Sequence, residues 1–190
     1  MSRARDPLQA GTMQRAVDEL LAVSRQRWVL GIGAVATATT AFAAASVASG
    51  GWWLPGLVVV IASAIVSAAR PDDHTGLVVV GLVIWQWLAR VDDVGTPWLP
   101  VAACCMLVFH ALLALTAVVP TSGSIPGATI ARWTERTAVV AASTVAMWIV
   151  VVVLERRDLP GNGALTGLAL LIVAATATAI RARSVRSPLR

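Results

Sequence analysis

The sequence predicts an all-α protein: a polytopic membrane bundle of about six transmembrane helices with a short N-terminal amphipathic helix. Three observations predict this class. Hydrophobic residues make up 57% of the 190 residues and charged residues only 13%, whereas a typical soluble domain is roughly 25% charged. The mean hydropathy is +0.77. Apolar runs close to the length of about 20 residues that spans a bilayer recur along the chain, so most of its surface suits lipid rather than water.

Six apolar segments meet or approach the length of a transmembrane helix. They are residues 28–48, 52–69, 75–90, 98–119, 137–154 and 163–180. Pro55 stands in the first turn of the second segment, where the missing N–H breaks no helical hydrogen bond. The third segment is the shortest, and a tilted or partly inserted helix is the alternative there. Thr96 and Pro97 resemble the start of a helix before the fourth segment, which ends at Pro120. The fifth segment extends back into an interfacial turn around Trp133.

Polar sequence flanks this transmembrane domain of residues 28–182 on both sides. The leader, residues 1–27, carries apolar residues at helical spacing with charged residues between them: Met13, Val17, Leu20 and Leu21, followed by Trp28. This pattern predicts an amphipathic helix on the inner membrane surface, with a docking helix for a partner as the alternative. Residues 183–190 form a basic cytoplasmic tail. A removable signal peptide is disfavoured because 27 mostly polar residues precede the first apolar run.

The orientation follows from the arginines, which account for all fifteen basic residues. With the N-terminus inside, twelve lie in inner segments: Arg3, Arg5, Arg15, Arg25, Arg27, Arg70, Arg132, Arg136, Arg181, Arg183, Arg186 and Arg190. Three lie in outer loops: Arg90, Arg156 and Arg157. This asymmetry predicts a multi-pass plasma-membrane protein with both termini in the cytoplasm. Arginines that set the orientation and attract anionic lipid also explain the net charge of +5. We therefore expect no nucleic-acid partner.

His110 is the ionisable side chain placed near mid-depth, in the fourth segment. Polar groups at that depth are the first place to look for function. One interpretation makes the imidazole a proton-sensitive group, a cofactor ligand or a contact for a transported species. The favoured interpretation is structural, with the imidazole hydrogen-bonded to Gln86 or Thr144 of a neighbouring helix. His110, Gln86 and Thr144 are therefore the candidate intramembrane polar site.

Two acidic pairs flank the third segment: Asp72 and Asp73 before it, and Asp92 and Asp93 after it. Paired carboxylates can bind a divalent cation or transfer protons. If the intervening residues form a helix, however, the pairs lie about 25 Å apart and cannot share one ion. Helix capping and pairing with nearby arginines are the favoured roles for these candidate interfacial acidic pairs.

The chain lacks the common signatures of enzymes. It has no zinc-binding His pair across a Glu, no phosphate-binding Gly-rich loop with a Lys and no Gly-x-Ser-x-Gly elbow. The absence of Lys excludes Schiff-base chemistry. Cys104 and Cys105 are adjacent within an apolar run. This position favours a role as small core residues over a role in a disulfide or a metal site. We therefore expect no enzymatic activity, no cofactor and no metal.

A cluster of aromatic and acidic residues in the middle of the chain resembles a group of known proteins. It comprises Trp85, Gln86, Trp87, Asp92, Asp93, Pro97, Trp98, Phe109, His110 and Ala111. This stretch is similar to uncharacterised small integral membrane proteins of actinobacteria, some of which are encoded beside MoxR-type AAA ATPases. The resemblance covers the middle third to half of the chain. It implies a multi-pass membrane protein and carries over no catalytic residue.

These observations favour a non-enzymatic accessory or scaffold subunit that partners other cell-envelope proteins. The alternative is a small transporter or channel with a polar site near His110. The expected partners are the lipid bilayer and either another membrane protein or further copies of the chain. Small residues in the first segment, among them Gly33, Ala34 and Ala41, offer a surface for close helix packing in such an oligomer.

Overall fold

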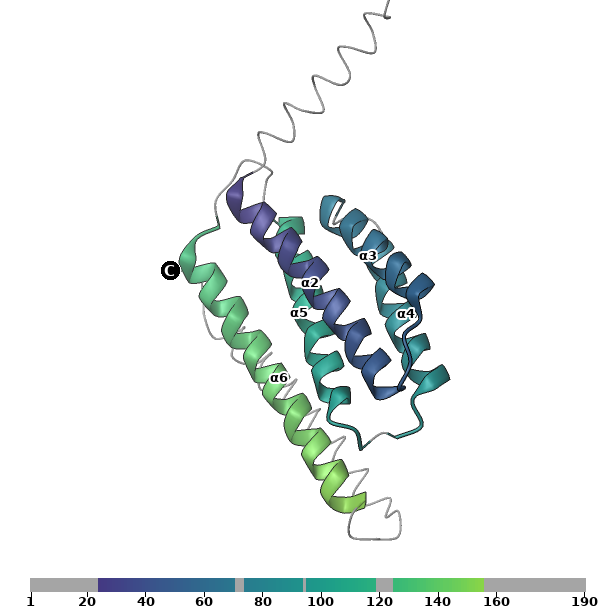
Figure 1. Ribbon diagram of the computed structural model, residues 1–190. Helices are drawn as coiled ribbons and strands as arrows, with labels where there is room; N and C mark the ends of the chain where they lie inside the picture. Colours follow the sequence, from purple (N-terminus) through teal and green to yellow (C-terminus); the bar gives the residue numbers. More distant parts are fainter. Residues whose placement is uncertain (1–23, 71–73, 94, 119–124, 156–190) are drawn as a thin grey trace, which may run out of the picture. The chain divides into compact units, whose positions relative to one another are not determined.

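The computed structural model describes residues 24–70, 74–93, 95–118 and 125–155 (Figure 1). Within these ranges the chain forms five α-helices and no strand, which confirms the all-α class there. The helices are α2 (Arg25–Ala48), α3 (Leu54–Ala69), α4 (Thr75–Arg90), α5 (Trp98–Val118) and α6 (Gly127–Glu155). The chain divides into two compact units, Met1–Thr137 and Ala138–Arg190, so α6 begins in the first unit and continues in the second.

Among the described helices, three are long and apolar enough to cross a bilayer: α2, α5 and residues Gly127–Leu154 of α6. These three indicate a membrane location. The other two, α3 and α4, are apolar but have only 16 residues each. The first five predicted segments all fall on helices. The sixth segment, residues 163–180, lies outside the described residues, as do the tail 183–190 and all but the last four residues of the leader.

The start of α6 differs from the expectation. The sequence placed it at residue 137 with an interfacial turn before it, but the helix runs without a break from Gly127. The carbonyl of Pro126 accepts hydrogen bonds from the amides of Thr129 and Ile130, which closes the first turn. No Gly or Pro follows until the helix ends, so nothing interrupts the hydrogen-bond ladder.

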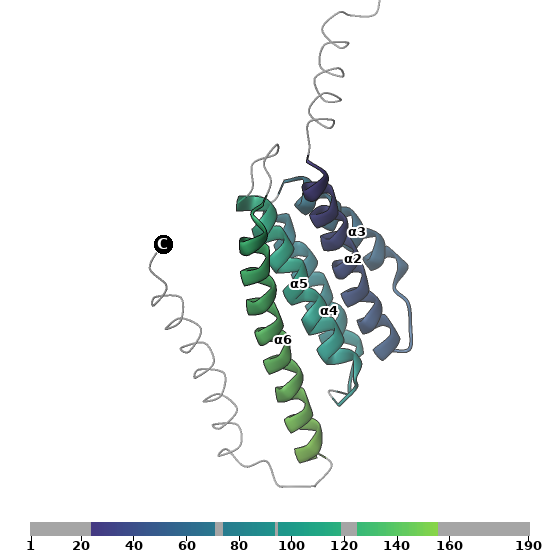
Figure 2. The same ribbon diagram turned by 90° about the vertical axis from the view of Figure 1, so that its left-hand side faces the viewer.

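The closest packing in the first unit is between α2 and α5, which lie side by side (Figures 1 and 2). Small side chains line the buried face of α2: Ala34, Ala38, Ala41 and Ala45 are fully buried. A Cβ atom added to Gly33 would lie 3.2 Å from Cδ1 of Leu112 on α5. The small-residue surface that suggested an oligomer is therefore used inside the chain, where it lets two helices approach closely without needing a hydrophobic driving force.

An antiparallel hairpin of α3 and α4 packs against α2. Val60 and Ala64 of α3 and Val79 and Val83 of α4 join the core, together with Phe42 and Phe109 from α2 and α5. At one end of the hairpin the hydroxyls of Ser67 and Thr75 are hydrogen-bonded at 2.9 Å. At the same end a Cβ added to Gly31 would lie 3.5 Å from Cβ of Ala68, so α3 ends beside the first two turns of α2.

The beginnings of α2 and α6 are also joined. Ser24 caps α2 and accepts a hydrogen bond from the Arg27 amide at 3.4 Å. Two residues later, Oε1 of Gln26 accepts a hydrogen bond from the backbone amide of Ile125 at 2.9 Å. The two residues are 99 positions apart in the sequence. Within the first unit, the start of α2, the end of α3 and the start of α6 therefore lie at one end of the bundle.

Candidate functional site

The structure places Gln86 in the interior of the first unit. It lies on the face of α4 that carries the buried Val79 and Val83, at helical spacing of four and three residues. Only 1% of its surface is exposed, and neither Oε1 nor Nε2 has a hydrogen-bond partner. The neighbouring Trp87 indole Nε1 is likewise buried without a partner. A buried amide in this condition is costly, since neither its donor nor its acceptor is satisfied.

His110 lies on the outside of α5. Phe109, the residue before it, fills the core position with 1% of its surface exposed, whereas His110 is exposed. Consecutive helical residues point about 100° apart, so the two side chains cannot both face the core. The hydrogen bond between His110 and Gln86 that the sequence suggested is not formed, because both amide atoms of Gln86 lack a partner.

Thr144 lies in the second unit, on the part of α6 that follows Ala138. It is half-buried, and its hydroxyl donates to the carbonyl of Val140 in the same helix at 2.9 Å. This local bond satisfies the hydroxyl without a second helix. The three residues of the predicted intramembrane site thus occupy three different settings: a buried amide, an exposed imidazole and a hydroxyl bonded to its own helix.

The acidic pairs can be followed on one side of α4 only. Asp92 and Asp93 are exposed after the helix ends, and Oδ1 of Asp93 accepts a hydrogen bond from the Gly95 amide at 2.7 Å. Such a bond two residues along the chain closes an Asx turn, which favours a structural role for Asp93. Asp72 and Asp73 lie outside the described residues.

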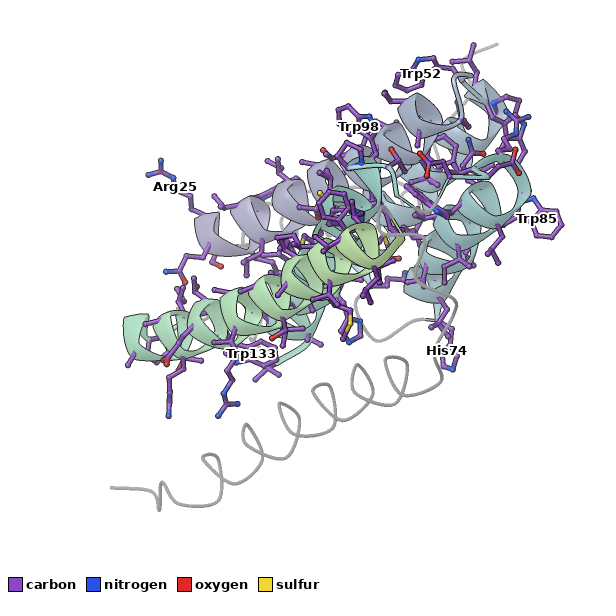
Figure 3. All side chains as sticks on the ribbon, turned by 90° about the horizontal axis from the view of Figure 1, so that it is seen from below. Arg25, Trp52, His74, Trp85, Trp98 and Trp133 are labelled. Atoms are coloured by element: carbon purple, nitrogen blue, oxygen red, sulfur yellow. The ribbon has the colours of Figure 1, made fainter. Side chains whose placement is uncertain are left out.

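The end of the hairpin where α3 begins and α4 ends holds a contact that the sequence did not predict. The Trp53 ring at the start of α3 lies over Gly56, so closely that a Cβ atom there would be 2.2 Å from Cε3. The Arg90 guanidinium at the end of α4 lies 5.9 Å from the centre of the same ring, a cation–π distance. A glycine one turn after a tryptophan was the available signal. In Figure 3 the side chains of Trp52 and Trp85 project outward, far from Arg25 at the opposite end.

The hydroxyl groups of α2 do not line a polar path. Each donates to a carbonyl of its own helix three or four residues earlier: Thr37 to Gly33 and Ala34, Thr39 to Val35, Thr40 to Ala36 and Ser46 to Phe42. Hydroxyls bonded in this way are satisfied without water or a neighbouring helix. The close packing of α2 against α5 is therefore apolar in character.

Within the described ranges, no three His, Cys, Asp or Glu side chains lie close enough together to hold a metal ion. The side chains there whose chemistry could support a function are the buried amide of Gln86, the outward imidazole of His110, and the Trp53 ring with the Arg90 guanidinium. Comparisons of the chain with protein-family models, with curated proteins and with solved structures found no match. Function therefore has to be inferred from the chemistry of these residues.

Proposed function

We propose that the chain is a non-enzymatic protein of the plasma membrane, an accessory or scaffold subunit that partners other cell-envelope proteins. In this proposal six helices cross the bilayer and both termini lie in the cytoplasm. The two 16-residue helices α3 and α4 each count as one crossing. Successive helices α2 to α5 alternate in direction (Figure 1), as helices joined by short loops in a membrane do.

The position of the arginines in the structure also supports this orientation. Arg25 and Arg27 begin α2, and Arg70 follows α3. The close approach of Gly31 to Ala68 and the hydrogen bond between Gln26 and Ile125 bring these helix ends together. One end of the first unit is thus rich in arginine, which favours the cytoplasmic side.

The observation that carries the subunit proposal is the outward position of His110. It lies twelve residues into α5, about 18 Å from the start of the helix at 1.5 Å per residue, which is near the middle of the bilayer. A polar ring facing lipid at that depth is unfavourable. A partner helix that offers a hydrogen-bonding group would satisfy it, and interhelical bonds of this kind contribute about 0.6 kcal/mol on average in membranes.

Transport is the less supported alternative. A translocation pathway needs polar groups that face one another along the membrane normal. His110 is instead exposed on the outside of the bundle, whereas Gln86 is buried in its interior. The α2 hydroxyls donate hydrogen bonds to carbonyls of their own helix. The unsatisfied amide of Gln86 is the feature in favour of a polar path.

Photo-crosslinking from position 110 tests the proposal. A benzophenone amino acid replaces His110 in the full-length protein, and native membranes are irradiated before mild-detergent purification. We expect one protein to be captured in high yield, and the same protein to co-purify with the unmodified chain. The matched control carries the label at Val101, which is 38% exposed on the opposite face of α5.

The two positions should behave differently. Capture from position 110 and not from 101 supports a specific subunit contact at this face. Adducts with lipid alone, or adducts within the chain, would contradict the proposal. Uptake of a solute by vesicles that contain only this protein, lost on Gln86→Leu, would instead support transport.

A further inference from the structure

The hairpin of α3 and α4 is short for a bilayer. Each helix has 16 residues, about 24 Å at 1.5 Å per residue. The hydrocarbon core of a typical bilayer is about 30 Å thick. In the same unit, α2 has 24 residues and α5 has 21, so the two sides of the bundle differ in length.

Polar residues mark both ends of the hairpin at matching levels. At the inner end, Arg70 and His74 are exposed just beyond α3 and just before α4. At the outer end the Arg90 guanidinium lies 5.9 Å from the Trp53 ring, so α4 ends where α3 begins. Because both helices cover the same height, tilting the hairpin would only shorten its apolar span further. The neighbouring bilayer has to adapt instead.

The outer part of α4 carries a second sign of a shallow apolar span. Trp85 is 64% exposed and lies about 7.5 Å inside the end of the helix. An indole ring is favoured at the headgroup level, where water and lipid carbonyls supply hydrogen bonds to its N–H group, and is disfavoured in hydrocarbon. The exposed ring of Trp85 therefore fits the interface rather than the membrane interior.

The outward faces of the hairpin are covered mainly by large aliphatic side chains. The most exposed are Leu54, Val58, Ile65, Leu77, Ile84 and Leu88, each more than half exposed. Close contacts between membrane helices use small residues that let the backbones approach. Branched aliphatic chains of this kind are instead typical of a surface that contacts acyl chains.

We propose that the outward face of α3 and α4 is a lipid-binding surface that holds a locally thinned bilayer, with the outer headgroup layer dipping to the level of Trp85. Its occupant is phospholipid with short acyl chains. The inference rests on the proposed topology, in which both helices cross the membrane. It adds two expectations to that topology. The bilayer is thinner beside α3 and α4 than elsewhere around the protein, and this face prefers lipids with short acyl chains.

Spin labelling in vesicles of phosphatidylcholine with 18-carbon chains tests the depth. The full-length protein with Cys104→Ala and Cys105→Ala receives a nitroxide at Ile84→Cys or, as the control, at Val101→Cys. Ile84 lies about 9 Å inside the end of α4 and Val101 only about 4.5 Å inside the end of α5. We expect the label at Ile84 to be at least as accessible to a water-soluble nickel reagent as the label at Val101. A label at Ile84 that oxygen reaches and nickel does not would overturn the proposal. Spin–spin broadening there would also overturn it, by showing a second copy on this face.

Competition between lipids tests the preference. Brominated phosphatidylcholines with 14-carbon or 22-carbon chains quench tryptophan fluorescence, and the difference between the native protein and Trp85→Phe isolates the signal of Trp85. We expect the shorter lipid to bind about twofold more strongly beside Trp85. Equal binding or a preference for 22-carbon chains would contradict a thinned bilayer.

A third measurement separates this inference from the topology on which it rests. A cysteine at His74 should react with a membrane-impermeant maleimide only from the cytoplasmic side. If it does, and the depth or lipid results fail, the mismatch inference alone is wrong. Reaction from the outside would show that the proposed orientation is wrong, and the inference, which places the dip in the outer headgroup layer, would fall with it.

Discussion

Replacing Gly56 with alanine should destabilise the first unit, because the space for a methyl group is already filled. The Trp53 ring would lie 2.2, 2.6 and 2.8 Å from the added Cβ atom at its three nearest carbons. Contacts this short force the ring to move. Since Trp53 packs against the core and under Arg90, its movement disturbs both contacts.

The size of the effect follows from three contributions. Overpacking a core typically costs about 1–3 kcal/mol, and a partly exposed cation–π contact contributes about 0.5–1 kcal/mol. Alanine favours a helix over glycine by up to about 1 kcal/mol, which offsets part of the loss. We expect Gly56→Ala to lower the free energy of unfolding by about 1–3 kcal/mol.

Unfolding by SDS from mild-detergent micelles, followed by far-ultraviolet circular dichroism, measures the change. The matched control is Gly81→Ala, also within a helix, where the added Cβ meets no atom within 4 Å apart from its chain neighbours and its own helix backbone. The control should be neutral or stabilising by up to about 1 kcal/mol. In a Trp53→Leu background, Gly56→Ala should lose most of its effect, because the clashing ring is gone. A Gly56→Ala protein as stable as Gly81→Ala would refute the reasoning.

Three further predictions concern topology, the outward imidazole and the hairpin. Reporter fusions at Gly95 should read outside and fusions at Gly123 inside, and a C-terminal fusion that reads outside would contradict six crossings. Because His110 is exposed, His110→Leu should change the stability of the purified protein in detergent by less than about 0.5 kcal/mol yet reduce co-purification of the partner, whereas His110→Gln should retain it. Ser67→Ala should lower stability by about 0.5–1 kcal/mol, and in a Thr75→Val background the same change should have less effect, since the 2.9 Å bond is already lost.

Helix positions were predictable from the sequence because lipid supplies no hydrogen bonds to the backbone. An apolar run inside a bilayer therefore has to be helical, and the run lengths located the first five segments. The early start of α6 was missed for a related reason. The charged residues around Trp133 suggested an interfacial turn before residue 137, but charge near a helix end does not by itself stop a helix, and no Gly or Pro after Gly127 interrupts this one.

The inward and outward faces of the long helices were not predictable. In a soluble protein the apolar stripe of a helix marks its buried face. In contrast, α2 and α5 are apolar on all sides, because apolar side chains suit both lipid and the protein core. The sequence therefore could not show that Phe109 faces the core and His110 does not. It also could not show that the candidate residues would occupy separate settings, since their pairing depends on helix rotation.

The pairing of α2 with α5 has a consequence for biosynthesis. Gly33 and its close neighbour Leu112 are separated by about 80 residues of chain, and ribosomes add about 5–20 residues per second. The alanine face of α2 therefore emerges several seconds before the helix that covers it, and the hairpin of α3 and α4 is made in the interval. During this time the alanine face of α2 is open to contact with other helices that carry small residues. A chain that stalls after α4 would leave this alanine face without α5 and free to pack against a helix of another protein.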